Sequence, residues 1–505
     1  MSVPVQACGF FHQPRHPLPT PIARTPRHLP SPRLVRAVLG ALMAASVAAC
    51  GGDGKGDYSA PASSTAAQPP AAPASPAEPP PAAIYKVSGT VSGLVGTGLV
   101  LQNNAGDDLA IAANGSFSFT TALLSGSGYA VTVKSQPRIL TRVCTVSNGT
   151  GTVADAAVGN VVVNCAAPAA RFAYATNFGS ANLFPYTIDA STGALGSMAG
   201  PMVGTGAAPA SIAVDPTGRF AYVANAYSDN VSAYTIDGST GVLRPMVVPT
   251  VAAGTSPFSI AVDPTGRFAY VANRDSNNVS AYTIDASTGA LSPMTVPTVP
   301  TGTLPYFIAV DPMGRFAYVA NAGSDDVSAY TIDATTGALS PATVPTVQAG
   351  ALPFSIAVDP TGRFVYVTNT YSASVSAYTI DAGTGALTPM AKPTTATGSN
   401  PESIAVDPTG RFAYVANFLS DNVSAYTVDA TTGALTPMAT PTVPARAGPI
   451  SVAVDPTGSF AYVTNFSSKD VSAYTINAST GALTLMTAST VATGGISPRS
   501  LALSR

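Results

Sequence analysis

Histidine and tryptophan are almost missing from this sequence of 505 residues. There is no tryptophan, and the three histidines (His12, His16 and His28) all lie near the N-terminus. If the leader that contains them is removed, the working protein has no histidine. This excludes Ser-His-Asp hydrolysis, Cys-His proteolysis and histidine-ligated zinc as its chemistry. We expect no cofactor and no metal site.

Charge is also scarce, with only 10% of the residues charged. The leader carries five arginines and no acidic residue, so its removal leaves 18 basic against 25 acidic residues. No basic cluster survives in this acidic remainder, and nucleic acid is therefore not expected as a partner. Glycine and proline, 45 of each, are instead abundant and spread along the chain. This composition favours many turns and an all-β fold.

Residues 1–49 have the pattern of an export signal peptide, in which basic residues precede a short apolar run. The run at 37–49 is shorter than the roughly 20 residues that a helix needs to cross a bilayer. Val47-Ala-Ala-Cys50 resembles the lipobox of bacterial lipoproteins. The resemblance implies cleavage before Cys50, a lipid on Cys50, and an outer-membrane lipoprotein of the cell envelope that faces the periplasm or the cell surface. An ordinary cleavage site that happens to end in cysteine is the alternative.

The chain after the leader changes character at about residue 84. Residues 50–83 are rich in proline, alanine and serine and cannot bury a core, which indicates a tether. Residues 84–167 read as short alternating strands separated by turn residues, and we expect a small β-sandwich similar to the immunoglobulin-like modules of bacterial lipoproteins. Cys144 and Cys165, each inside an expected strand of an exported domain, are expected to form a disulfide.

Residues 168–505 repeat one unit of 48 residues. Two tyrosine series keep this step through seven copies, and each copy reads as four short strands separated by turn signals. The series are Tyr174, Tyr222, Tyr270, Tyr318, Tyr366, Tyr414 and Tyr462, and Tyr186, Tyr234, Tyr282, Tyr330, Tyr378, Tyr426 and Tyr474. A four-stranded unit of this length cannot bury both of its faces alone, so the copies must pack against one another.

The two ends of the repeat region complement each other. The first copy begins at Ala170-Arg-Phe-Ala-Tyr174 and lacks its first strand, whereas the chain ends with Ser500-Leu-Ala-Leu-Ser504, which has the sequence of that strand. A closed ring uses such truncations to remove its edge strands, and an open solenoid does not. We therefore predict a seven-bladed β-propeller, with strands A to D in each blade, in which the C-terminal strand completes the first blade.

The repeated motifs resemble those of a known family. Tyr222-Val-Ala-Asn225, Tyr366-Val-Thr-Asn369 and the recurring Ile-Asp-x-x-Thr-Gly-x-Leu are similar to the YVTN repeat proteins and the lactonase-type seven-bladed propellers related to 6-phosphogluconolactonase. The resemblance covers about residues 170 to 505 and supports the propeller. It is less specific for activity, because propellers host many functions. The machinery proposed for the family usually includes a histidine at the channel mouth, and the exported protein would have none.

The strand order places the A–B and C–D turns on one rim of the ring, which we call the repeat rim, and the B–C and D–A loops on the other. The repeat rim carries Asp-Pro-Thr-Gly at Asp215 and equivalent positions, a sequence typical of type I turns. We expect these aspartates to be structural, because single carboxylates spread evenly around a ring do not supply the several oxygen ligands that calcium needs.

The opposite rim, which we call the variable rim, differs between copies. The position just before each strand A is Ala210, Phe258, Tyr306, Phe354, Glu402, Ile450 or Arg499, and the B–C loops add Tyr227, Arg274, Tyr371 and Phe418. Variation among otherwise repeated units can encode recognition of an asymmetric ligand, and drift in exposed loops is the alternative. As binding residues we predict Phe258, Tyr306, Phe354, Tyr227, Tyr371 and Phe418.

Two functions stay open. The first is a lipid-tethered binding or scaffold protein whose variable rim holds a protein, peptide, glycan or small molecule. The second is a lactone hydrolase in which Glu402 acts as general base on a water and Arg499 or Arg274 stabilises an anionic group. An exposed glutamate near its ordinary pKa of about 4.3 is a poor base at neutral pH. We therefore favour binding over catalysis.

Overall fold

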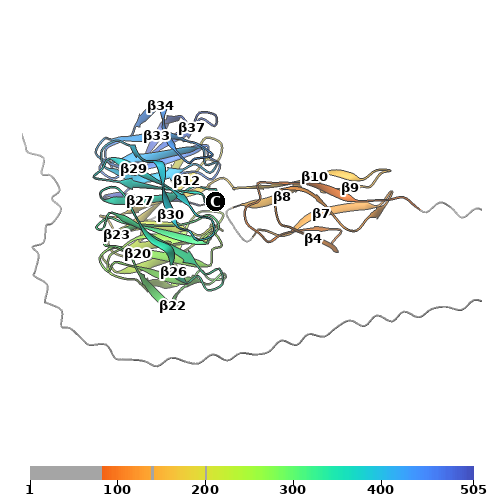
Figure 1. Cartoon of the computed structure of the whole chain (residues 1–505), viewed down its shortest axis with the longest axis horizontal. Helices are drawn as coiled ribbons and strands as arrows, with labels where there is room; N and C mark the ends of the chain where they lie inside the picture. Colours follow the sequence, from red (N-terminus) through yellow and green to blue (C-terminus); the bar gives the residue numbers. More distant parts are fainter. Residues whose placement is uncertain (1–81, 138–141, 199–201, 505) are drawn as a thin grey trace, which may run out of the picture. The chain divides into compact units, whose positions relative to one another are not determined.

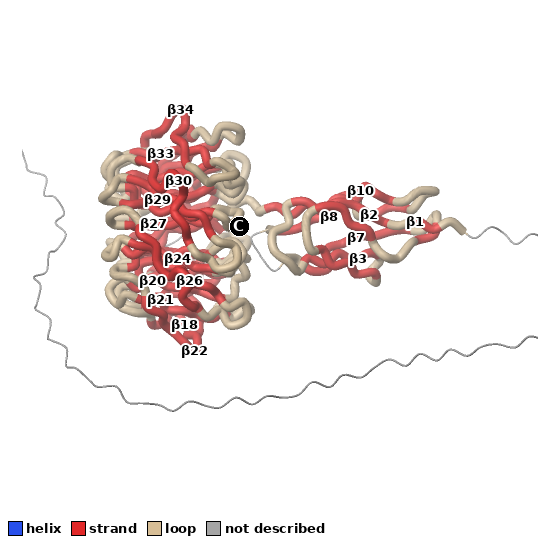
Figure 2. The backbone as a smooth tube through the Cα atoms, in the orientation of Figure 1, coloured by secondary structure: helices blue, strands red, loops and turns tan. Residues whose placement is uncertain are grey.

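A computed structural model of the chain describes residues 82–137, 142–198 and 202–504. The expected signal peptide and tether lie outside the described residues, except for the last two positions of the tether. Every regular element in the described part is a strand, and Figure 2 shows these strands joined by loops. A helix long and apolar enough to span a membrane is therefore absent from these ranges.

The first ten strands form a small domain of two four-stranded sheets and one two-stranded ribbon. Both large sheets contribute to one core, with Val87, Leu99 and Val163 fully buried in it. The domain is thus a β-sandwich, as predicted, and its likeness to immunoglobulin-like modules stays a prediction. Its strands are β1 (Ile84–Tyr85), β2 (Val87–Ser92), β3 (Leu99–Asn103), β4 (Asp107–Ile111), β5 (Gly115–Ser118), β6 (Leu123–Leu124), β7 (Gly128–Ser135), β8 (Val143–Ser147), β9 (Thr150–Thr152) and β10 (Val158–Ala166).

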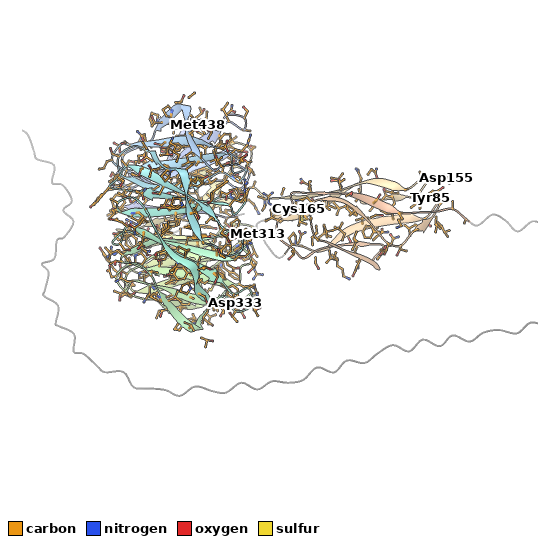
Figure 3. All side chains as sticks on the ribbon, viewed as in Figure 1. Tyr85, Asp155, Cys165, Met313, Asp333 and Met438 are labelled. Atoms are coloured by element: carbon orange, nitrogen blue, oxygen red, sulfur yellow. A yellow bond between two sulfur atoms is a disulfide. The ribbon has the colours of Figure 1, made fainter. Side chains whose placement is uncertain are left out.

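The predicted disulfide is present in this small domain. Cys144 of β8 and Cys165 of β10 are directly opposed across an antiparallel pair and are joined by a sulfur–sulfur bond. Cys165 is labelled in Figure 3. A cross-link that closes a loop of this size contributes on the order of 3 kcal/mol by restricting the unfolded chain.

The remaining strands form seven sheets, each with the strand order A-B-C-D (Figure 1). Blade 1 is β39 (Pro498–Ser504), β11 (Phe172–Asn177), β12 (Asn182–Ile188) and β13 (Leu195–Ser197), with β14 (Val203–Gly204) also on β12. Blades 2 to 4 are β15 (Pro209–Val214), β16 (Phe220–Asn225), β17 (Asn230–Ile236) and β18 (Leu243–Ala252); β19 (Pro257–Val262), β20 (Phe268–Asn273), β21 (Asn278–Ile284) and β22 (Leu291–Pro300); and β23 (Pro305–Val310), β24 (Phe316–Asn321), β25 (Asp326–Ile332) and β26 (Leu339–Gln348).

Blades 5 to 7 are β27 (Pro353–Val358), β28 (Phe364–Asn369), β29 (Ser374–Ile380) and β30 (Leu387–Ala396); β31 (Pro401–Val406), β32 (Phe412–Asn417), β33 (Asn422–Val428) and β34 (Leu435–Pro444); and β35 (Pro449–Val454), β36 (Phe460–Asn465), β37 (Asp470–Ile476) and β38 (Leu483–Ala492). Each strand A contacts the strand A of the next blade, and β39 contacts both β35 and β15. The ring is therefore closed, and its last strand pairs antiparallel with β11 as predicted.

The tyrosines of the first series join neighbouring blades. Each hydroxyl donates a hydrogen bond to the carbonyl of a turn glycine in the next blade, as Tyr222 does to Gly289 at 2.7 Å. Tyr462 donates to Gly193 at 2.9 Å and so continues the series across the junction of blades 7 and 1. These tyrosines are fully buried, and a hydrogen bond to the next blade satisfies a hydroxyl that would otherwise be costly to bury.

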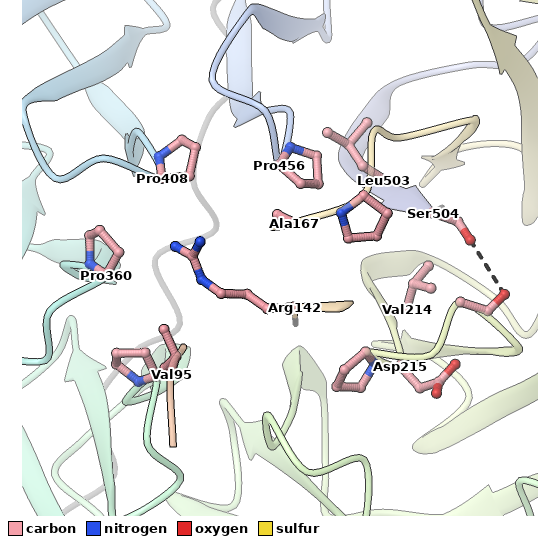
Figure 4. Close-up of a pocket in the computed structure, with 14 residues that line it drawn as sticks. Val95, Arg142, Ala167, Val214, Asp215, Pro360, Pro408, Pro456, Leu503 and Ser504 are labelled. Carbon is pink, nitrogen blue, oxygen red and sulfur yellow. Dashed lines mark hydrogen bonds between the residues drawn. The ribbon is translucent and has the colours of Figure 1, made fainter. Parts of the chain in front are cut away.

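The repeat rim consists of turns in which the aspartate carboxylate accepts hydrogen bonds from its own turn. The Asp215 side chain accepts hydrogen bonds from the backbone N–H groups of Thr217, Arg219 and Phe220 and from the Thr217 hydroxyl. Figure 4 shows Asp215 at this rim, where the adjoining turn prolines Pro360, Pro408 and Pro456 surround the opening. Because each such aspartate is engaged in its own turn, the contacts support the structural role expected for this rim.

Candidate functional site at the variable rim

The variable rim is shaped by a bulge at the start of strand A. Pro257 pairs with Asn273 and Ser259 pairs with Ala272, so Phe258 is an extra residue that pairs with nothing on β20. The same irregularity recurs at Tyr306, Phe354 and Glu402. Our placement of these residues just before strand A was therefore wrong, because the strand continues through the bulge to the preceding proline. A bulge re-aims the side chain of its extra residue.

The re-aimed side chains enclose a cavity of about 50 Å³ at this end of the channel. Five residues from our predicted set line it: Phe258, Tyr306, Phe354, Glu402 and Arg499. The structure therefore brings the proposed acid–base residue and the proposed anion-binding arginine into one site. The cavity is also lined by Ala210, Ser211, Phe307, Ser403, Ile450, Ser451 and Ser500.

Arg499 reaches across the mouth from the closing strand. Its guanidinium carbon lies 4.5 Å from the ring centroid of Phe258 in blade 3 and 5.7 Å from that of Phe354 in blade 5. A third ring, Phe178, lies at 5.5 Å. Cation–π contacts of this kind stabilise the charge but leave the N–H donors unused. No hydrogen bond or ion pair joins the Arg499 guanidinium to another residue of the described part.

Glu402 is half-buried beside this aromatic group, not exposed as our objection to catalysis assumed. Burial raises its pKa to about 7, although the nearby Arg499 charge and a hydrogen bond from Asn400 act in the opposite direction. The Asn400 amide nitrogen lies 3.0 Å from the Glu402 carboxylate. Burial also lowers the pKa of Arg499, which Glu402 counteracts. At neutral pH, Glu402 is therefore present in both protonation states.

The other arginine that we predicted is already neutralised. Arg274 forms a two-pronged ion pair with Asp275, with nitrogen–oxygen distances of 2.7 and 2.9 Å, and its guanidinium also lies 4.9 Å from the Phe258 ring. It is not part of the cavity wall. Arg499 is therefore the better candidate than Arg274 for binding an anion.

The predicted loop aromatics do not line the cavity but lie on the rim around it. Tyr227 and Tyr371 are 71% and 67% exposed. Tyr227 packs edge-on against Phe178, the same ring that contacts Arg499. Phe418 packs against Phe466, with 6.0 Å between their ring centroids. The structure thus separates the predicted aromatics into an inner group and an outer group.

Sequence reasoning missed three features of the site: Phe178 on Arg499, Asn400 on Glu402, and a ring of serines one position further along strand A. Ser259 illustrates the ring, because its hydroxyl oxygen accepts the backbone N–H of Ile308 in the next blade at 3.2 Å. Phe307 interrupts it. The serine repeat was visible in the sequence, and its replacement by phenylalanine at residue 307 could have indicated that this position belongs to the site. The contacts of Arg499 carried no such signal.

Within the described ranges, no group of three or more histidine, cysteine, aspartate or glutamate side chains is arranged to hold a metal ion. The residues that the cavity itself offers for chemistry are a half-buried arginine, a half-buried glutamate and aromatic rings.

The model of the family described as lactonase, 7-bladed β-propeller, matches this chain over residues 108–255, 166–352 and 345–505. None of the curated proteins matches it. The fold is similar to that of a candidate 6-phosphogluconolactonase from Bacteroides fragilis NCTC 9343, at 19% identity and a TM-score of 0.58, covering 66% of this chain and 98% of that one.

A second solved structure, the periplasmic gluconolactonase PpgL of Pseudomonas aeruginosa, is 20% identical with a TM-score of 0.55, covering 66% of this chain and 99% of that one. At these identities the two likenesses support the fold alone. The family model covers most of the chain, including all seven blades. The chain therefore belongs to the lactonase family of seven-bladed β-propellers.

Proposed function

We propose that the cavity at the variable rim binds the carboxylate of a small anionic ligand through Arg499. The observation that carries this proposal is a half-buried guanidinium held by three rings, without a hydrogen-bond partner among the described residues. A charged side chain that is partly removed from water normally has an oppositely charged or hydrogen-bonding partner, because that partner replaces the water it has lost. A ligand carboxylate would take the place of this water and accept two parallel hydrogen bonds from the guanidinium N–H groups.

Glu402 fits the same ligand. In its protonated form it donates a hydrogen bond to a carboxylate, and in its ionised form it repels one. The cavity volume of about 50 Å³ accommodates a group of carboxylate size but not a whole sugar. The ligand would therefore insert its acidic group between Arg499 and Glu402 and leave the rest of the molecule on the rim.

The test is calorimetric titration of the purified protein with D-galacturonate and with benzoate at pH 6. We expect Arg499→Ala to lower the affinity for the carboxylate that binds by about 30-fold or more, because loss of a desolvated charged partner costs about 2–5 kcal/mol. Arg446→Ala is the matched control, because Arg446 lies on the same rim, is 55% exposed and pairs with Asp470. Binding that is equal in Arg499→Ala and the native protein contradicts the proposal.

A lactone hydrolase is the second candidate, and the observation that favours it is the pKa of Glu402, raised to about 7. The ionised carboxylate would take a proton from water while the water oxygen bonds to the lactone carbonyl carbon. Arg499 would stabilise the oxyanion. The ring C–O bond would then break, and the leaving oxygen would take up the proton to give a hydroxy acid.

The pH dependence of the native protein distinguishes the two functions. Carboxylate binding should weaken about tenfold between pH 6 and pH 8, because Glu402 loses its proton through a pKa of about 7. Lactone hydrolysis should increase over the same interval, because the ionised form is the base. Glu402→Gln should remove the pH dependence in either case. If the protein binds carboxylates, the variant should still bind them strongly at pH 8; if it is a hydrolase, the variant should be inactive. Turnover of a lactone panel that Glu402→Gln abolishes would establish the hydrolase.

We also propose that the protein is an outer-membrane lipoprotein attached through Cys50. The support is the lipobox-like Val47-Ala-Ala-Cys50 before the Pro/Ala/Ser-rich segment, together with the disulfide, which is typical of exported proteins. Metabolic labelling with a palmitate analogue should mark the native protein, and Cys50→Ser should remove the label.

A further inference from the structure

The aromatic residues that the repeat does not require gather at the variable rim. Beyond the two tyrosine series and the phenylalanine that opens each strand B, the propeller has ten aromatic residues. Phe184 lies on β12, and the others lie in the bulges, at the third position of strand A or in the B–C loops. These nine are Phe178, Tyr227, Phe258, Tyr306, Phe307, Phe354, Tyr371, Phe418 and Phe466. Packing of the blades alone does not explain why they share one end of the ring.

Two of the nine, Tyr227 in blade 2 and Tyr371 in blade 5, present their side chains to solvent at the variable rim. Tyr227 belongs to blade 2 and packs on the Phe178 ring that Arg499 also contacts. Tyr371 belongs to blade 5 and follows Thr370, whose hydroxyl donates a hydrogen bond to the carbonyl of Pro401, next to Glu402. Tyr227 is therefore connected to Arg499 through one shared ring, and the residue before Tyr371 bonds to the residue before Glu402.

Both tyrosines stand on fixed loops. The Tyr227 backbone N–H bonds to the Ala207 carbonyl at 3.1 Å, and that of Tyr371 bonds to the Ala351 carbonyl at 3.2 Å. Each loop is thus tied to the D–A loop before the strand A of its own blade. A large aromatic ring on an ordered loop has few rotatable bonds and offers binding area at low cost in conformational entropy. The same bond recurs in other blades, as from the Leu419 N–H to the Ser399 carbonyl at 3.2 Å, so the repeat itself holds the backbone under each tyrosine in place.

We propose that the ligand is an acidic oligosaccharide in which one uronic acid inserts its carboxylate at Arg499 and the flanking sugar rings stack on Tyr227 and Tyr371. This deepens and rests on the proposed carboxylate binding. The cavity holds only the acidic group, so further contacts must come from the surrounding rim. A pyranose ring has an apolar C–H face that packs on an aromatic face while its hydroxyls stay in water, which an open tyrosine ring permits.

A peptide ending in a free carboxylate fits this rim less well. Extended peptides commonly add to a free strand edge. At this rim the blades end in loops, and the B–C loop N–H groups of Tyr227 and Tyr371 are already bonded to the D–A loops. The flat, separated tyrosine rings suit sugar faces rather than a peptide side chain that requires a pocket.

The experiment compares D-galacturonate, trigalacturonate, neutral galactotriose and trialanine by titration calorimetry on the native protein. We expect trigalacturonate to bind about tenfold or more tighter than galacturonate, and galactotriose and trialanine to bind more weakly than the trimer. The double variant Tyr227→Ala/Tyr371→Ala should bring the ratio of trimer to monomer affinity close to one. Tyr227→Phe/Tyr371→Phe should keep it high, because the ring face remains. Val247→Ala, on the outer strand β18, is the control.

The outcomes separate this inference from the function on which it rests. Equal affinities for monomer and trimer, both lost in Arg499→Ala, overturn the oligosaccharide inference and leave carboxylate binding standing. Trimer binding that survives Arg499→Ala overturns both. Trialanine binding tighter than trigalacturonate overturns the sugar ligand in favour of a peptide. A trimer-to-monomer ratio that Val247→Ala lowers as much as the double tyrosine variant overturns the placement on the rim.

Discussion

Deletion of β39, from Pro498 onward, is expected to abolish the single cooperative unfolding transition of the propeller. β39 pairs along β11 and contacts both β15 and β35, so its loss breaks the ring at one point and leaves β11 with an open edge. Leu501, only 7% exposed, would leave a hole in the core that it shares with Tyr462. An open edge next to exposed apolar surface also promotes aggregation. Scanning calorimetry and limited proteolysis measure both effects.

Deletion of Arg505 alone is the control for shortening the chain and should leave the transition unchanged. Leu501→Asp keeps the full length and should lower the midpoint without removing the strand. A protein truncated before Pro498 that unfolds in one transition at the native midpoint would show that β39 does not close the ring.

Gly337→Ala is expected to destabilise the propeller by about 2–5 kcal/mol. Gly337 has φ of +74°, a conformation that costs an alanine about 1–2 kcal/mol. A Cβ at this position would lie 2.4 Å from a Phe268 ring carbon in the neighbouring blade, and relieving such a clash in a packed core costs a further 1–3 kcal/mol or so. The Gly337 carbonyl also accepts the Tyr270 hydroxyl at 2.7 Å, so a shift of the turn would strain that bond.

Chemical denaturation measures this loss, and Gly238→Ala is the matched control. Gly238 lies in the corresponding type of turn in blade 2, and a Cβ there would meet no atom within 4 Å. Its substitution should change the free energy of unfolding by no more than about 0.5 kcal/mol. Equal stabilities of the two variants would mean that the turn does not pack against the neighbouring blade as described.

The repeat made most of the fold predictable, because a constant step of 48 residues ties each residue type to one place in every blade. The copies had to pack against one another, and Ser500-Leu-Ala-Leu-Ser504 had to serve as the missing strand. What the repeat could not supply is the position of single side chains. The bulge at Phe258 depends on pairing with β20, and no residue type in the motif indicates it.

The sequence predicted several of the residues that line the cavity, but it did not predict their pKa values or their charge contacts. Glu402 and Arg499 stand out in the sequence because they differ from the equivalent residues of other blades. The raised pKa of Glu402 comes from burial, which depends on how side chains of several blades meet at the mouth. The three rings around Arg499 come from blades 1, 3 and 5, so their meeting depends on the closed ring.

Arg499, which lines the cavity at the variable rim, belongs to β39, the strand that closes the propeller ring. Binding and structural integrity are therefore thermodynamically linked, since any anion that binds Arg499 only in the closed ring adds to its stability, by an amount that increases with the logarithm of the anion concentration. A polypeptide interrupted during synthesis or trimmed by a protease at its C-terminal end would lose Arg499, and with it the proposed anion site, together with the closed ring. Damaged copies would then not compete with intact ones for the same molecules.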